Sequence, residues 1–253
     1  MAFWPVAKWY FLRTSQSPEE LSGLVAIFIA IFFVASQRSR RDIDFTDRSF
    51  YAHALALIIC YALAYHFVPP MIRAALALTA LTRIVSSLFL KRKFHAGLWI
   101  LLGLSLPVIP SLQFYLGYPL RAAVAQIALP LISMAGFAVT REGACFHFGE
   151  QLIWIDAPCS GIQMLWAGLL LAAACSCFKN LDSLRTAFVL SAACIMAVFA
   201  NAVRSAALFF IEAHIVKAPA WFHEGIGILV FMMLGFFILL SVHRASSRRL
   251  LHI

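Results

Sequence analysis

Three residues in the second half of the chain could together carry out nucleophilic chemistry on a carbonyl group. Cys159 lies where a polar loop runs into an apolar segment, and Arg204 and His223 lie near the facing ends of the next two apolar runs. The start of a helix lowers the pKa of a thiol, because backbone N–H groups point at the sulfur there. Arginine can stabilise an oxyanion and histidine can move protons. These residue types predict acyl transfer through a cysteine.

The order of the apolar runs brings these residues to one membrane face. Cys159 begins one predicted helix, which turns back at residues 179–185, and Arg204 lies in the last two turns of the returning helix. His223 opens the following crossing. Positive residues in the turn and at the C-terminus indicate the cytoplasmic side, so we expect the site on the extracytoplasmic side. Asn201 precedes Arg204 by three residues and is expected to face the same neighbour.

The composition indicates a membrane protein. Hydrophobic residues make up 63% of the chain and charged residues 12%, whereas about a quarter of the residues in a soluble domain are charged. The sequence therefore predicts an all-α polytopic membrane protein. One spanning helix needs roughly 20 apolar residues, so residues 1–253 accommodate a single integral membrane domain with seven or eight transmembrane helices.

The net charge of +9 does not indicate a nucleic-acid partner, because the basic residues lie in short runs between apolar segments. Such runs are typical of topology signals beside a lipid bilayer, and we expect all of them in the cytoplasm. They follow the first, third and last apolar runs and comprise Arg38, Arg40, Arg41 and Arg48; Lys91, Arg92 and Lys93; and Arg244, Arg248 and Arg249.

Counting the crossings exposes a conflict in the second half of the chain. The apolar runs fall near residues 21–36, 50–68, 70–90, 96–113, 119–139, 161–178, 187–211 and 222–242. If Lys93 and the C-terminus are both cytoplasmic, an even number of spans must separate them. The five runs after Lys93 therefore cannot all be simple spans. Run 119–139 contains Arg121 and Pro130, so we expect it to lie in the interface or to re-enter it. The alternative is that it spans and one basic cluster lies outside.

A short polar segment precedes the candidate nucleophile. Residues 140–160 alternate like a pair of strands, and Gly149 and Glu150 are typical of a turn, which predicts a β-hairpin-like loop on the extracytoplasmic surface. Cys145 lies in this segment, and a disulfide to Cys159 would block the nucleophile, so we expect Cys145 to have no role. The cysteines show no metal-ligand spacing, and we expect neither a metal nor an organic cofactor.

Three motifs in this order resemble the exosortase/archaeosortase family. They are Pro-Cys-Ser-Gly at 158–161, Ala-Asn-x-x-Arg at 200–204 and Phe-His-x-x-x-Gly at 222–227, within a similar stretch at 119–243 that would be an exosortase-like catalytic core. The resemblance implies that Cys159 is the nucleophile, Arg204 its positively charged partner and His223 the acid/base. Pro158 departs from the family, since many members carry a small residue such as alanine there.

Within these motifs, three further residues are expected to support the site or bind substrate: Asn201, Ser160 and Gly161. The resemblance implies a membrane-embedded cysteine peptidase or transpeptidase in the cytoplasmic membrane. It would cleave the C-terminal sorting signal of exported proteins, which combines a recognition motif, a transmembrane helix and a basic tail. The reaction would pass through a thioester to water or to an amine on a lipid or surface polymer.

Two alternatives from other functional classes stay open at this point. A small-solute transporter could use Arg73, Arg83 and Arg204 as charges within the membrane, although no matching acids accompany them. A non-catalytic scaffold or assembly protein could keep the same fold. The scaffold hypothesis predicts that Cys159→Ala has no effect, whereas an enzyme would lose its activity.

Overall fold

The computed structural model is mostly helical, with one small antiparallel sheet. It describes residues 3–15, 21–38, 48–65, 67–90, 92–219 and 221–247. The chain divides into two compact units, one formed by residues 1–108 and 173–187 and the other by residues 109–172 and 188–253. Cys159, Arg204 and His223 all belong to the second unit.

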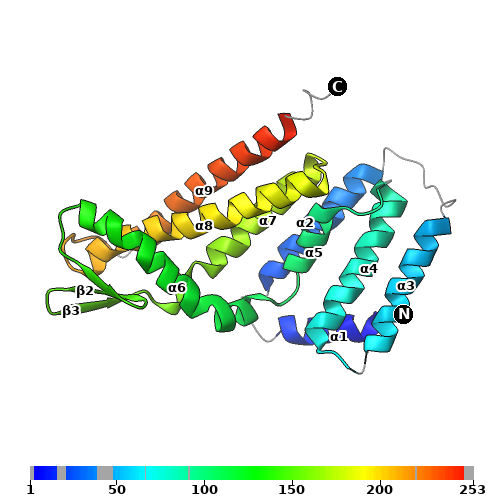
Figure 1. The fold of residues 1–253 in the computed structure, drawn as a ribbon, viewed down its shortest axis with the longest axis horizontal. Helices are drawn as coiled ribbons and strands as arrows, with labels where there is room; N and C mark the ends of the chain where they lie inside the picture. The colour runs from blue at the N-terminus through cyan, green and yellow to red at the C-terminus, as the bar shows by residue number, and fades with distance from the viewer. Residues whose placement is uncertain are drawn as a thin grey trace. The chain divides into compact units, whose positions relative to one another are not determined.

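The first unit is built from the N-terminal helices and the turn that joins α7 to α8 (Figure 1). In its core the ring of Phe33 is fully buried and packs against His95 and Phe178. The guanidinium of Arg92 donates to the carbonyls of Asn180 and Leu181, at 2.9 and 3.0 Å, and so satisfies backbone groups just after α7. The helices are α1 (Trp4–Thr14), α2 (Ser22–Arg38), α3 (Arg48–Ala64), α4 (Pro70–Leu90) and α5 (Ala96–Leu104).

Arg73 of α4 makes local contacts within this unit. Its guanidinium donates to the carbonyl of Tyr65 at 3.3 Å and lies over the Tyr65 ring, 4.7 Å from the centroid. A cation over an aromatic face is a common stabilising contact. This structural role weakens the transporter hypothesis, which needed Arg73 as a charge for a solute.

The apolar run 96–113 is not one helix. Helix α5 has only nine residues and ends at Leu104, because the residue before Pro107 is disfavoured in helical conformation. Nine residues rise about 14 Å, roughly half of the hydrocarbon core. The chain then starts a new helix, α6 (Ile109–Met134), with Pro110 at its second position, where no N–H is needed.

Whether run 119–139 crosses the membrane simply stays a prediction. Helix α6 continues through Pro119 and Pro130 for 26 residues and is long and apolar enough to span a bilayer. Arg121, which suggested the interface, instead donates to backbone carbonyls at Gly117 and Ile155. With nine residues, α5 is shorter than the roughly 20 residues that a spanning helix needs.

The second unit combines α6 with the long C-terminal helices. Gly168 of α7 lies at a close crossing, because a Cβ there would meet Leu234 at 3.5 Å and Ala197 at 3.9 Å. In the part of the chain that the structure describes, four helices are long and apolar enough to cross a membrane, and shorter apolar helices accompany them. The predicted count of seven or eight transmembrane helices stays a prediction. The remaining helices are α7 (Ile162–Phe178), α8 (Ser183–Glu212) and α9 (Trp221–Ser247).

The predicted hairpin is confirmed, and a third strand extends it. Strands β2 (Cys145–Phe148) and β3 (Gln151–Trp154) pair antiparallel around Gly149 and Glu150, and β1 (Thr140–Glu142) pairs with the other edge of β2. Phe146 and Ile153 lie opposite each other and are both buried. This face of the sheet packs in one apolar core with α6 and the end of α8 (Figure 1).

The basic clusters of the sequence analysis are only partly described by the structure. Arg38 ends α2, Arg48 begins α3 and Arg244 lies in the last turn of α9. Arg40, Arg41, Lys91, Arg248 and Arg249 lie outside the described residues.

Candidate active site

Cys159 lies in a short turn rather than in the first turn of a helix, where the sequence analysis placed it. Residues Ala157–Ser160 form a 3-10 turn in which the N–H of Cys159 donates to the carbonyl of Asp156 at 2.9 Å. Gly161 follows with a φ of +84°, in the left-handed region, and α7 begins only at Ile162. One left-handed residue therefore separates the turn that carries the thiol from the helix.

Asn201 of α8 holds this turn from the opposite side. Its side-chain amide donates to the carbonyl of Cys159 at 3.0 Å, and Asn201 itself is 1% exposed. A Cβ on Gly161 would lie only 2.6 Å from the same amide nitrogen. Gly161 is thus required twice, once for its positive φ and once to let Asn201 reach the turn.

Two side chains of α6 form hydrogen bonds with the segment 155–160, one at each end. The buried hydroxyl of Ser160 donates to the side-chain carbonyl of Gln113 at 3.1 Å. Arg121 donates to the carbonyl of Ile155, at 3.4 Å, where the chain leaves β3. The sequence analysis assigned no such role to Gln113 or Arg121, and no local signal marks them, because both partners lie more than 30 residues away.

Arg204 is the cation that acts on the thiol. Burial raises the pKa of Cys159, and the Arg204 guanidinium opposes this rise, while the carboxylates of Glu212 and Asp156 add to it. The expected lowering of the thiol pKa by a helix start is therefore not what the structure has. Arg204 itself passes over Gly227 of α9, where a Cβ would lie 3.4 Å from its Nε. This Nε is buried and has no hydrogen-bond partner among the described residues.

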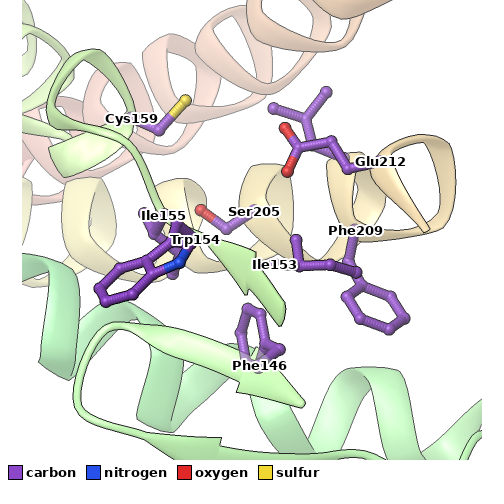
Figure 2. Close-up of a pocket in the computed structure, with 9 residues that line it drawn as sticks. Phe146, Ile153, Trp154, Ile155, Cys159, Ser205, Phe209 and Glu212 are labelled. Atoms are coloured by element: carbon purple, nitrogen blue, oxygen red, sulfur yellow. The ribbon is translucent and has the colours of Figure 1, made fainter. Parts of the chain in front are cut away.

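The thiol borders a small pocket with a cavity volume of about 20 Å³, room for little more than one water molecule. Figure 2 shows the sulfur of Cys159, the carboxylate of Glu212 and the hydroxyl of Ser205 among the side chains that line it. The other walls are mostly apolar and come from the sheet and from α8: Phe146, Ile153, Trp154, Ile155, Leu208 and Phe209.

His223 lies in the first turn of α9 and is partly buried. Its electrostatic influence falls on Glu212, on which Asp156 also acts. Glu212 in turn acts on Cys159. His223 is not among the residues that line the pocket beside Cys159.

The comparison with known protein families decides the class of this protein. The profile of the transmembrane exosortases matches residues 14–240, which is most of the chain. The chain belongs to the transmembrane exosortase family. No curated protein and no solved structure matches it.

As an exosortase, the protein is a multi-pass membrane protein. Its family consists of membrane cysteine proteases and transpeptidases that process sorting signals. The match begins at residue 14, so the family resemblance extends beyond the stretch 119–243 to the N-terminal helices. Those helices were recognised from the sequence only as apolar segments.

Two pocket residues of this exosortase carry a signal that the sequence analysis did not use. Asn201, Ser205, Leu208 and Glu212 follow one another at spacings of four, three and four residues, which is one face of a helix. Once Asn201 was a candidate, this spacing could have predicted that Ser205 and Glu212 share its face. Cys145, by contrast, is a free, buried cysteine whose thiol donates to the carbonyl of Glu142.

Proposed function

We propose that this exosortase cleaves the C-terminal sorting signal of exported membrane proteins through a thioester at Cys159, on the extracytoplasmic side of the cytoplasmic membrane. The observation that supports this most directly is that the Cys159 thiol borders a pocket and that the Arg204 guanidinium lowers its pKa against the effect of burial. The substrate would combine a recognition motif, one transmembrane helix and a basic tail. That arrangement would deliver a peptide bond to the membrane surface, where we expect the hairpin and the Cys159 turn.

The first half of the reaction forms the thioester. Because burial raises the pKa of Cys159, the thiol is protonated at rest and needs a base. His223 would accept the proton from the sulfur. The sulfur then attacks the substrate carbonyl carbon, and the electron pair of the C=O bond moves to the oxygen. When this pair returns, the C–N bond breaks, and the leaving amine takes the proton from His223.

Arg204 would stabilise the negative charge on the carbonyl oxygen in the transition state. One donor of this kind lowers the barrier by about 2.7–4 kcal/mol, so the loss of Arg204 should slow the reaction on the order of 100-fold. Asn201 would hold the backbone of the nucleophile in place, with Ser160 and Gly161 shaping the turn. This division of roles agrees with the observed hydrogen bond between Asn201 and Cys159.

The second half of the reaction releases the acyl group. An amine of a lipid or surface polymer, or a water molecule, attacks the thioester carbonyl, the C–S bond breaks and the thiol regains its proton. An amine acceptor gives transpeptidation and water gives hydrolysis.

The decisive experiment co-expresses the protein with a membrane-anchored candidate substrate from its host and measures the intact mass of that substrate. Wild type should remove the C-terminal segment, and Cys159→Ala should leave it intact at an equal protein level. Cys145→Ala is the matched control, because Cys145 lies on the neighbouring strand β2, and it should process normally. Processing by Cys159→Ala as fast as by wild type would reject the enzyme and favour a scaffold.

A further inference from the structure

We propose that the outer edge of strand β3 binds the recognition motif of the substrate as an added strand and leads its scissile bond to Cys159. This inference rests on the proposed function and adds a binding site to it. Strand β3 lies at one end of the strand order β1-β2-β3, so the sheet pairs with one of its two edges and leaves the other free (Figure 1). Cys159 follows the last residue of this strand by five positions.

The polar backbone groups at the outer edge belong to Leu152 and Trp154. In an antiparallel pair, residues that exchange hydrogen bonds alternate with residues whose N–H and C=O groups point away from the partner. The N–H of Ile155 donates to the carbonyl of Ala144 at 3.0 Å, so the polar groups of Ile153 also face β2. Those of Leu152 and Trp154 therefore face outward, and no backbone group of the described residues outside the sheet bonds to them.

This edge is open to a peptide. Leu152 and Trp154 are 44% and 57% exposed, whereas Ile153 between them is 8% exposed and anchors the strand in the core. Edge strands are commonly protected by lysine or proline, and β3, with the sequence Gln-Leu-Ile-Trp, has neither. Its four residues suit a short extended motif. Main-chain hydrogen bonds would give affinity, and alternate side chains of the motif would give specificity.

The edge continues into the candidate active site. Trp154 lines the pocket that Cys159 borders, so a peptide paired with Trp154 would lie beside the thiol (Figure 2). The carbonyl of Ile155, next along the chain, accepts from Arg121 at 3.4 Å. The Cys159 turn is held by Asn201. These bonds fix the distance between the edge and the thiol, which selects the peptide bond that is cleaved.

The small size of the pocket agrees with binding along an edge. Its volume of about 20 Å³ holds little more than one water molecule, which is too small for the side chain of a recognition motif. An added strand needs no deep pocket, because its affinity comes from the backbone.

Leu152→Pro tests the backbone pairing. Proline removes the outward N–H of residue 152 and leaves the hydrogen bonds between β2 and β3 in place. With purified protein in detergent and the membrane-anchored candidate substrate, Leu152→Pro should raise KM about 3- to 10-fold and leave kcat within about twofold. Leu152→Ala keeps the N–H and should raise KM less. A KM for Leu152→Pro equal to that for Leu152→Ala would overturn the proposal.

Cross-linking tests the same edge without catalysis. A photo-crosslinking amino acid is placed at Leu152 in the Cys159→Ala variant, and a control carries it at Arg141, on the opposite edge strand β1. Irradiation should join the recognition motif of the substrate to position 152 and not to position 141. This measurement also decides the matter if thermal unfolding shows that Leu152→Pro does not fold.

Two results of the cross-linking would overturn the proposal. One is the absence of a substrate adduct at position 152. The other is an adduct between two copies of the chain, because the edge would then serve dimerisation. Failure of the proposed function looks different, since wild type would process nothing while the substrate adduct at position 152 still forms.

Discussion

The side-chain amide of Asn201 donates a 3.0 Å hydrogen bond to the backbone carbonyl of Cys159. Asn201 lies on α8, 42 residues from the nucleophile in sequence, and this bond reaches it in a turn that belongs to no α-helix. A residue that holds backbone rather than substrate acts on the position of the thiol. Substitution of Asn201 should therefore affect the reaction by moving the Cys159 sulfur, and not by removing a group that contacts the substrate.

Replacing Asn201 by Asp should slow substrate processing about tenfold or more. An ionised carboxylate keeps the shape of the amide but cannot donate to the Cys159 carbonyl, and a buried hydrogen bond of this kind contributes about 1 kcal/mol to stability. The measurement is the processing rate together with thermal unfolding in detergent. Gln163→Glu makes the same chemical change at an exposed position of α7 and should have little effect. A normal rate for Asn201→Asp would show that the bond is dispensable.

Replacing Gly161 by Ala should destabilise the protein more than replacing Gly149 by Ala. Both glycines have positive φ, at +84° and +60°, and a Cβ in that region costs about 1–2 kcal/mol. At Gly149 a Cβ would have nothing within 4 Å, whereas at Gly161 it would lie 2.6 Å from the Asn201 amide. The difference in unfolding free energy between the two variants reports this clash. Equal destabilisation would mean that Asn201 moves away at no cost.

Replacing Arg204 by Met should move the alkylation of Cys159 to higher pH. The guanidinium lowers the thiol pKa, so its removal raises that pKa and leaves less thiolate at any given pH. The alkylation rate against pH is measured in a chain whose other five cysteines are replaced by serine. Arg204→Lys keeps the positive charge and should keep the pH dependence of alkylation. It should process the substrate slowly, because lysine lacks the planar set of donors of a guanidinium. An unchanged profile in Arg204→Met would remove Arg204 from the site.

The protein should lose stability as the pH falls from about 6.5 to about 4, through His95. Burial and the charge of Arg92 lower the pKa of His95 to about 4, and His95 caps α5 by accepting from the N–H of Leu98. Because the folded pKa lies below the unfolded one, this stability is present above pH 6.5 and falls by at most about 3 kcal/mol on acidification.

His95→Asn tests the origin of this pH dependence. Asparagine is a good N-cap and does not titrate, so the variant should unfold with a flatter dependence on pH over the same range. Thermal unfolding between pH 4 and pH 7 measures it. A dependence as steep as that of wild type would assign the acid sensitivity to other groups.

The sequence by itself determined the membrane class, the family and the residues with reactive side chains. Composition and the three motifs depend only on residue type and spacing, so Cys159, Arg204 and His223 could be chosen without coordinates. The turn at Gly149 and Glu150 was equally readable, because its residue preferences and the alternation of its strands are local.

Only the tertiary structure decided which apolar run is short and what surrounds the thiol. The break after Leu104 follows from the local effect of Pro107, but the continuity of α6 through Pro130 depends on packing, which overrides the local preference of proline. The pKa of Cys159 depends on burial and on charges brought from α8, and these outweigh the expected effect of a helix start. Glu212 and Cys159 could be assigned to one pocket only once α8 and the turn before α7 had been placed in space, because the two residues lie far apart in the sequence.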